Sequence, residues 1–490
     1  MDTDMAVPEE LDHVELTLTG PTMEQPLAPL NLTGADSPAF PRTLALLGNG
    51  SSPVTIKAVG LRLAAPVVTD TVRTHFVDGE KLMVRLVLTA ACVGVMCPAD
   101  QTCSDGKCLA IDRDGSSLPS WPGTPPPRPG LGGQTIGGRT LWAGGWRSCA
   151  TQGQNLYCWG ENDAGQLGDG NINAFVSRVP VVDLATFPVS VALGFKHTCI
   201  CDRNGQAWCW GLNSDGQLGV PSTGSNDVQL EPVAVPTVTD CVQITAGYWH
   251  TCAIRGNRTI SCWGRNSNGQ LGQPTTTVMS TPVPQVVAGF ADVIEVKAGE
   301  KFNCGRNPTA VVCWGDNFFG ELGDGTTTSR SMPVKVNLPG GSAELATGRH
   351  FACVRTGGGQ VSCWGENSDE LIGSASASAV TTPTLIAQLD DAVQIAAGHR
   401  HACALRASRV VSCWGSNQFA QLGAGPGTNS AVPVDVTDLR DVTEVVAGVV
   451  HSCARHASGA VSCWGQNIAS QLGDGTIAER ILPVGVVGFF

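Results

Sequence analysis

The chain has 490 residues, and its 60 glycines and 30 prolines make it rich in residues that interrupt or turn regular structure. Such a composition favours many short strands joined by turns over long helices. The net charge of −12 argues against a nucleic-acid-binding protein, and no apolar run reaches the roughly 18 residues that a membrane-spanning helix requires.

Residues 12–90, within a first domain predicted at 1–91, alternate between apolar and polar side chains in the manner of β-strands. In the first segment Val14, Leu16 and Leu18 share one side, and a similar run begins at Leu82. Because helical periodicity is missing, about five strands are expected, and they predict a small immunoglobulin-like β-sandwich. The other expected strands lie at 42–47, 54–63 and 72–77.

A cysteine-rich segment follows at residues 92–109. It is too short to form a hydrophobic core of its own, so we expect two disulfide bonds to hold it together. It resembles the cysteine-rich mini-modules that follow a sandwich domain in bacterial surface proteins. Zinc binding is the alternative, although zinc ligands usually come in closer pairs. Residues 110–137, rich in proline and glycine, predict a stiff, extended linker. The cysteines of the segment are Cys92, Cys97, Cys103 and Cys108.

The remainder of the chain, residues 138–490, is built from a repeat. The tripeptide Cys-Trp-Gly occurs seven times at intervals of 50 to 53 residues. Four antiparallel strands make one propeller blade, so seven copies predict an all-β, seven-bladed propeller. We expect the ring to close end to end, with the strand near 140–144 and the strand at 482–487 in the same region of the ring. In the third copy, the four expected strands lie at 242–247, 250–254, 259–264 and 282–287.

The repeated motif is Gly-x-x-His-(Thr/Ser/Ala)-Cys-Ala, followed by Cys-Trp-Gly-x-Asn-x-x-Gly-Gln-Leu-Gly-Asp-Gly. It resembles the regulator of chromosome condensation repeat over residues 138–490. Proteins with this repeat include a secreted bacterial β-lactamase inhibitor that acts by protein contact, a nuclear guanine-nucleotide exchange factor and a plant ultraviolet photoreceptor. Later copies depart from the motif, which we expect to loosen turns without changing the fold, at Glu321, Leu371, Ala420 and Ser470.

The recurrent residues have structural roles in this interpretation. The tryptophans fill the space between blades, and asparagines such as Asn162 bond the local backbone of a turn. Histidines recur at one motif position but are spread round the ring, and three copies have Arg147, Phe302 or Phe351 there. We therefore expect no metal cluster among the histidines, which are His197, His250, His401 and His451.

A second cysteine precedes each Cys-Trp-Gly by nine or ten residues. A tight turn between the two strands places these cysteines opposite each other, which predicts seven disulfide bonds within blades; free thiols are the alternative. Each bond closes a loop of about ten residues and contributes roughly 2–3 kcal/mol. Whether Cys201 and Cys241 bridge adjacent blades stays open. The predicted pairs are Cys149–Cys158, Cys199–Cys209, Cys252–Cys262, Cys304–Cys313, Cys353–Cys363, Cys403–Cys413 and Cys453–Cys463.

The predicted disulfide bonds require an oxidising compartment. The N-terminus lacks a basic start and an apolar segment, so we expect that the chain begins after a removed signal or at a misassigned start. We expect an extracellular, cell-surface or periplasmic location in a bacterium. Membrane contact is expected only through a lipid anchor at a native N-terminus.

No catalytic motif stands out from the repeat. We expect a non-catalytic, monomeric binding or adhesion scaffold that uses no cofactor and no metal and binds no nucleic acid. Guanine-nucleotide exchange on a small GTPase is one alternative. An enzyme or a light sensor is another, although only Trp146 and Trp249 match the tryptophan pattern of the photoreceptor.

A partner-binding face is predicted where the first-to-second and third-to-fourth strand connections of every blade emerge together. The variable positions there carry aromatic and basic residues that the fold does not require, and such residues are enriched at interface hot spots. The alternative is that these rings fold into the gaps between blades. We expect this face to contact a protein or glycan through Trp146, Phe195, Tyr248, Trp249, Lys301, Phe318, Phe319, Arg349, His350, His399, Arg400 and Phe419.

Overall fold

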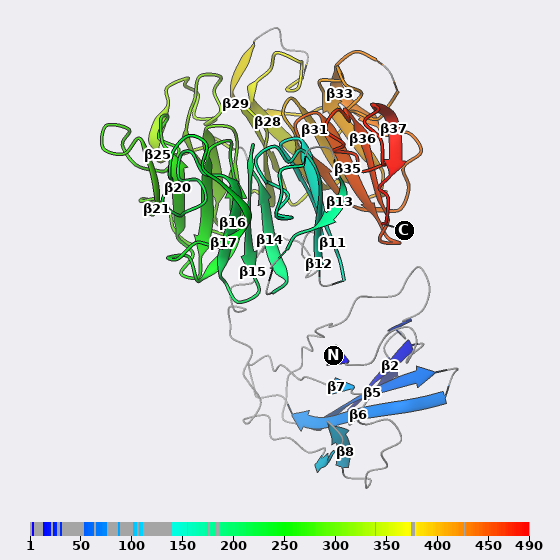
Figure 1. The fold of residues 1–490 in the computed structure, drawn as a ribbon. Helices are drawn as coiled ribbons and strands as arrows, with labels where there is room; N and C mark the ends of the chain where they lie inside the picture. The colour runs from blue at the N-terminus through cyan, green and yellow to red at the C-terminus, as the bar shows by residue number, and fades with distance from the viewer. Residues whose placement is uncertain are drawn as a thin grey trace. The chain divides into compact units, whose positions relative to one another are not determined.

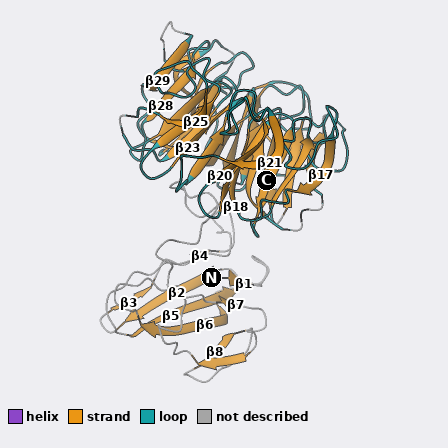
Figure 2. Ribbon diagram, turned by 90° about the vertical axis from the view of Figure 1, so that its left-hand side faces the viewer, coloured by secondary structure: helices purple, strands orange, loops and turns teal. Residues whose placement is uncertain are grey.

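The computed structural model describes residues 140–490, apart from 154, 174–175, 183, 185, 339, 374–377, 426 and 490, together with the backbone of nine strands before residue 140. The chain divides into two compact units, residues 1–126 and 127–490, which are taken in turn. In the described part of the chain every regular element is a strand, as the orange arrows of Figure 2 show.

The first unit contains an antiparallel sheet in the order β3-β2-β5-β6, with β4 also paired to β2. The strands expected at 54–63 and 72–77 overlap β5 and β6, and the hairpin β8-β9 sets Cys103 opposite Cys108 in its backbone register. The segment 42–47, the other two cysteines of the mini-module and the linker lie outside the described residues, so the sandwich stays a prediction. The strands are β1 (Asp2–Thr3), β2 (His13–Gly20), β3 (Met23–Pro26), β4 (Leu30–Asn31), β5 (Pro53–Arg62), β6 (Ala65–His75), β7 (Val87–Leu88), β8 (Gln101–Ser104) and β9 (Lys107–Ala110).

The second unit is a seven-bladed β-propeller, which confirms the predicted fold. Its strands form seven antiparallel sheets of four, and each sheet consists of four consecutive strands. Figure 1 shows the blades following one another round a ring, with the orange and red last blade beside the cyan first blade. The first strand of every blade lines the axis of the ring.

The strands of blades 1 to 4 are β10 (Leu141–Gly144), β11 (Arg147–Gln152), β12 (Asn155–Gly160), β13 (Val176–Pro180), β14 (Pro188–Leu193), β15 (His197–Asp202), β16 (Ala207–Leu212), β17 (Val228–Ala234), β18 (Cys241–Ala246), β19 (His250–Arg255), β20 (Ile260–Arg265), β21 (Ser280–Val286), β22 (Glu295–Ala298), β23 (Phe302–Arg306), β24 (Val311–Gly315) and β25 (Arg330–Lys335). Those of blades 5 to 7 are β26 (Glu344–Thr347), β27 (Phe351–Arg355), β28 (Val361–Glu366), β29 (Ala379–Leu385), β30 (Ala392–Ala397), β31 (His401–Arg406), β32 (Val411–Gly415), β33 (Ser430–Asp435), β34 (Val442–Ala447), β35 (His451–His456), β36 (Val461–Gly465) and β37 (Arg480–Gly485).

The outermost strand of every blade carries proline. Because proline lacks a backbone N–H, it blunts an exposed sheet edge against pairing with another chain. The sequence therefore protects each of the seven outer edges separately, at Pro180, Pro232, Pro282, Pro284, Pro333, Pro383, Pro433 and Pro483.

The first and last blades share no strand, so the ring closes through side chains and through a backbone hydrogen bond from the N–H of Val449 to the carbonyl of Gly145 at 3.0 Å. The backbone N–H and the hydroxyl of Thr140 both donate to Oε2 of Glu444, at 3.0 Å. The ring of Phe489 packs against Trp159 with centroids 5.7 Å apart. The expected meeting of the two ends of the propeller is thereby confirmed.

The seven tryptophans that follow cysteine are completely buried, as expected for side chains between blades. Six of their indole N–H groups donate to a backbone carbonyl of the preceding blade; Trp210, for example, donates to Gln166 at 3.0 Å. The exception is Trp414, whose indole nitrogen has no hydrogen-bond partner in the described part of the chain. In the preceding blade, Leu371 replaces the usual Gln.

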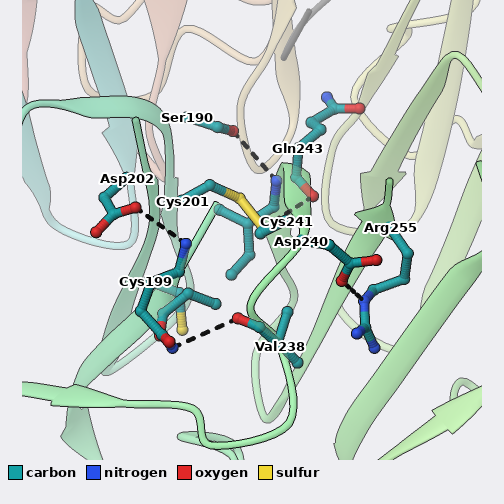
Figure 3. Close-up of a disulfide and its surroundings, with 12 residues drawn as sticks. Ser190, Cys199, Cys201, Asp202, Val238, Asp240, Cys241, Gln243 and Arg255 are labelled. Carbon is teal, nitrogen blue, oxygen red and sulfur yellow. Dashed lines mark hydrogen bonds and ion pairs between the residues drawn. A yellow bond between two sulfur atoms is a disulfide. The ribbon is translucent and has the colours of Figure 1, made fainter. Parts of the chain in front are cut away.

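Each predicted cysteine pair occupies opposed positions on the second and third strands of its blade, with Cα atoms 4.0 to 4.1 Å apart and sulfurs at bonding distance. Cys201 and Cys241 are also paired, and they join β15 of blade 2 to β18 of blade 3 (Figure 3). Beside them, Ser190 Oγ accepts a hydrogen bond from the backbone N–H of Ile244 at 3.1 Å. This junction thus has a covalent link in addition to packing.

The repeated asparagine organises the loop after Cys-Trp-Gly. Its Oδ1 accepts the backbone N–H five residues on in every blade, as Asn162 does from Leu167 at 2.9 Å. The loop also needs one residue with positive φ, which is Gly in blades 1 to 4. Glu370, Ala420 and Ser470 take φ of 57° to 59° there, so the departures from the motif leave the turn intact.

Candidate interaction face

The turn after the first strand and the loop after the third strand of each blade emerge on one face of the propeller. Contacts between the two kinds of segment show this directly: Lys196 in a turn pairs with Asp163 in a loop, and Arg400 pairs with Asp369 at 3.4 Å. We call this surface the aromatic face. It comprises turn residues 145–146, 195–196, 248–249, 300–301, 349–350, 399–400 and 449–450, and loop residues 163–164, 214–215, 267–268, 318–319, 368–369, 418–419 and 468–469.

Most of the predicted contact residues are half-buried, and one of the twelve is exposed. Phe318 is 71% exposed, whereas His350 is 8% exposed and therefore buried. The structure thus leaves eleven of the twelve predicted residues accessible, at least in part. The partly exposed ones are Trp146, Phe195, Tyr248, Trp249, Lys301, Phe319, Arg349, His399, Arg400 and Phe419.

Three rings from different blades meet at the mouth of the axial channel. Tyr248 stacks on Phe195 with centroids 4.6 Å apart, and it lies nearly parallel to His399 at 6.3 Å. Trp249 meets the same Tyr248 edge-on at 5.3 Å. Below these rings the first strands of all seven blades line a cavity of about 300 Å³.

The charged groups around this mouth oppose protonation of His399. Burial, followed by the charges of Arg349 and Arg400, lowers the pKa of His399 to about 3. Burial also raises the pKa of Tyr248, and Glu300 adds to that effect. Both rings are therefore neutral at physiological pH. They can stack as flat rings, but they do not act as an acid or a base there.

A cluster of charged side chains, with buried acids and partly exposed bases, links blades 4 and 5 beside the mouth. Glu300 accepts from Arg349, lies 3.4 Å from Nζ of Lys301, and lies 3.4 Å from Nε2 of His350. The other ring nitrogen of His350 is 3.3 Å from Glu321. Sequence reasoning selected the bases of this cluster but missed its two acids. The sequence did contain one sign of the cluster: Glu321 replaces a Gln that recurs at this position of the repeat.

A cation already covers one indole of the face. The Arg265 guanidinium lies 4.8 Å from the centre of the Trp249 ring, and its Nε donates to Asp215 at 2.9 Å. Cation–π contacts of this kind operate within about 6 Å of the ring centre. Sequence reasoning missed Arg265, because its position after Cys-Trp-Gly is variable and gives no sign of the contact.

No group of His, Cys, Asp and Glu in the described residues is placed to hold a metal ion. The described part of the chain also contains no helix capable of crossing a membrane. Aromatic rings, paired arginines and loop backbone are the groups that the face offers.

Curated relatives match part of the chain. The ultraviolet-B receptor UVR8 of Arabidopsis thaliana is 33% identical over 138 residues, which cover 27% of this chain and 31% of the receptor. The mitochondrial RCC1 domain-containing protein RUG3 of the same plant is 30% identical over 206 residues, covering 38% of this chain and 44% of RUG3. The chain thus spans less than half the length of these relatives.

Solved structures share the fold. Human WBSCR16 superposes with a TM-score of 0.63 at 21% identity, covering 69% of this chain and 94% of that one. Prp20p of Saccharomyces cerevisiae superposes with a TM-score of 0.62 at 22% identity, covering 69% and 87%.

Family models identify the repeat itself. The model of the regulator of chromosome condensation (RCC1) repeat matches residues 155–201, 204–254, 262–305, 358–405 and 411–455. A second model of the same repeat matches 189–217, 241–270 and 392–421. Together with the seven four-stranded blades, these matches show that the chain belongs to the family of RCC1-repeat β-propellers.

Proposed function

We propose that this propeller is a non-catalytic scaffold that uses its aromatic face to bind a protein or glycan partner outside the reducing cytosol. The observation that supports this most is that aromatic rings of several blades gather on one face and keep part of their surface exposed. Phe318 is 71% exposed, and Tyr248, Trp249 and Phe319 are partly exposed although the fold does not need them. Exposed aromatic residues with nearby arginines are typical of interface hot spots.

The location rests on the cysteines. Eight pairs lie at bonding distance within the propeller, and disulfide bonds of this number persist only in oxidising compartments. This argues against the alternative, guanine-nucleotide exchange on a cytosolic or nuclear GTPase. The solved structure of Prp20p is described with binding to Gsp1p and histones, but at 22% identity it supports the fold alone.

The proposal is tested with the full chain immobilised and the Trp249→Ala/Phe319→Ala double variant beside it. Partners captured from secreted fractions would be purified, identified and titrated against both proteins. We expect the double variant to lose at least 100-fold in affinity, because hot-spot truncations often cost 2 kcal/mol or more each. The thermal midpoint should change little.

A matched control lies on the opposite face. Arg203 and Arg409 are exposed in turns between second and third strands, and the Arg203→Ala/Arg409→Ala variant should keep full affinity. Equal loss in both double variants, or none in either, would contradict the assignment to the aromatic face.

A further inference from the structure

The cavity on the propeller axis is large enough to hold a small molecule. Its volume is about 300 Å³, at the lower end of the roughly 300–1,000 Å³ that ligand pockets have. In five blades the residue before the motif glycine is alanine, so the wall is mostly apolar at this level and the centre stays open. These lining residues are Ala143, Leu193, Ala246, Ala298, Thr347, Ala397 and Ala447.

Three aromatic rings line one end of the cavity. Phe195 stacks on Tyr248, and the planes of Tyr248 and His399 lie within 8° of parallel. Tyr248 and His399 are neutral at physiological pH, and flat rings attract other flat rings by stacking. This end of the cavity therefore suits the flat, apolar part of a molecule.

One basic residue in the wall of the cavity departs from the repeat. Among the first strands of the seven blades, all of which the structure describes, Lys297 is the single Lys or Arg. Its side chain lines the cavity and is 22% exposed, and its Nζ lies 3.6 Å from Oε1 of Glu295. The repeated fold does not require a charge at this position. The other six blades have uncharged residues there, which are Trp142, Ala192, Thr245, Ala346, Ala396 and Val446.

Blade 5 shows that the glutamate beside Lys297 does not need the lysine either. In blade 4, Oε2 of Glu295 accepts from Nε of Arg306 at 2.6 Å and from a backbone N–H of the next blade at 3.1 Å. In blade 5, Oε2 of Glu344 accepts from Nε of Arg355 and from a backbone N–H of the next blade, both at 3.1 Å. The two glutamates have the same kinds of donor, although alanine takes the place of the lysine in blade 5.

The charges beside the cavity do not cancel. The Glu–Arg pairs of blades 4 and 5 are each neutral, so Lys297 leaves this group with a net charge of +1. At the mouth, Glu300 is paired with Arg349 and also lies near Lys301, so it does not balance the lysine. A charge withdrawn from bulk water is costly unless an opposite charge compensates it, and an anion in the cavity would do so.

We propose that the axial cavity binds a small organic carboxylate, whose charge is matched by Lys297 and whose flat body stacks against Tyr248 and His399. The inference goes beyond the proposed function, because it assigns a small-molecule site to the axis of the propeller. A carboxylate fits because the excess is a single positive charge and because a lysine ammonium offers several N–H donors. The volume of the cavity restricts the ligand to a small molecule.

The test is a fluorine NMR titration of the full chain with para-fluorobenzoate, a small flat carboxylate, and with para-fluorobenzamide, its uncharged counterpart of nearly the same shape. We expect the benzoate resonance to broaden and shift saturably. The benzamide, and the benzoate with the Lys297→Ala variant, should each bind more weakly by about tenfold or more, because a charge-assisted hydrogen bond is lost. An equal response to both probes, or a response to neither, overturns the inference.

Lys335→Ala is the matched control, because Lys335 is exposed on the outer strand of the same blade and its removal changes the net charge equally. This variant should bind the benzoate as the wild type does. Ala397→Leu narrows the cavity without changing its charge and should prevent saturable binding; Leu193 shows that the fold accepts leucine at this place in the repeat.

Unchanged binding in Lys297→Ala or Ala397→Leu, or an equal loss in Lys335→Ala, would place the benzoate outside the cavity and overturn the inference. The proposed function is judged separately. Trp249 and Phe319 do not line the cavity, so the Trp249→Ala/Phe319→Ala variant should bind the benzoate normally even where partner capture is lost.

Discussion

His451 of the last blade is hydrogen-bonded to Ser148 of the first, with 2.8 Å between Nε2 and Oγ. The Ser148 hydroxyl lies 3.3 Å from the backbone carbonyl of Gln471 and donates to it. The imidazole must therefore be the donor, which fixes a neutral ring with its proton on Nε2. One hydroxyl thus joins two parts of blade 7 to blade 1.

The same pairing recurs round the ring. Where a blade has histidine at this motif position, the next blade has a polar residue to accept its proton, as in His197–Thr251, His250–Asn303 and His401–Ser452. Where a blade has phenylalanine, the next blade has alanine, and the two pack in one apolar cluster. These apolar junctions are Phe302–Ala352 and Phe351–Ala402.

The first prediction concerns this pairing. Ser148→Ala should destabilise the propeller by about 1–3 kcal/mol, because it leaves the buried N–H of His451 without an acceptor. Adding His451→Phe should recover most of the loss by copying the Phe351–Ala402 junction. Urea unfolding with the disulfide bonds intact measures both. If the double variant is no more stable than Ser148→Ala, the match between the residue at 451 and its neighbour at 148 does not contribute to the free energy of unfolding.

The second prediction is a loss of stability in acid. Burial, as the largest cause, lowers the pKa of His197, His401 and His451 to about 3 and that of His250 to about 4. Unfolded histidine binds a proton below about pH 6.5, and the folded protein does not until far lower pH. Stability should therefore be unaffected above this pH and fall as the pH drops towards 4.

Each histidine contributes up to about 1.4 kcal/mol per pH unit to this decline. The His401→Phe/Ser452→Ala variant lacks one such group, so its free energy of unfolding should fall less steeply between pH 6 and 4. Parallel pH profiles of the variant and the wild type would contradict the buried neutral state of His401.

The third prediction concerns loop residues with positive φ. Ala420→Gly and Ser470→Gly should each stabilise the protein by up to about 1 kcal/mol, because a left-handed conformation strains residues with a Cβ. The reverse change, Gly216→Ala, should destabilise it, since the new Cβ would lie 2.8 Å from the backbone nitrogen of Pro282. The midpoint of thermal unfolding of each variant tests this prediction. A lower midpoint for Ala420→Gly than for the wild type would refute the argument from strain.

The fourth prediction compares two kinds of disulfide. Loop-closure entropy predicts a loss of about 4 kcal/mol for Cys201→Ser/Cys241→Ser and about 3 kcal/mol for Cys149→Ser/Cys158→Ser, because the first pair closes the longer loop. The sequence separations are 40 and 9 residues. Denaturant unfolding of both double variants tests the order. A larger loss from the pair within the blade would show that packing at these sites outweighs chain entropy.

The propeller could be predicted from the sequence because seven copies repeat the same strands, turns and cysteines at a nearly constant interval. The stack of Phe195, Tyr248 and His399 could not, because these residues come from blades 2, 3 and 6 and meet only through the curvature of the ring. The contact of Glu321 with His350 could not be predicted either. The repeat shows that residue 321 departs from the motif, but it does not show which residue of another blade it contacts.

Separate blades have a consequence for how the chain can be cut and joined. Each sheet is one uninterrupted stretch of sequence, and contacts of Glu444 and Ser148 together with one backbone hydrogen bond close the ring, without a shared strand. The two ends of the propeller, at Thr140 and Phe489, therefore meet at one of seven junctions between blades, and among the described residues the junction of blades 2 and 3 has a disulfide bond as well. New termini opened at another junction, with the old ends linked, should leave every sheet whole. Whole blades are thus the natural unit of duplication in such a gene.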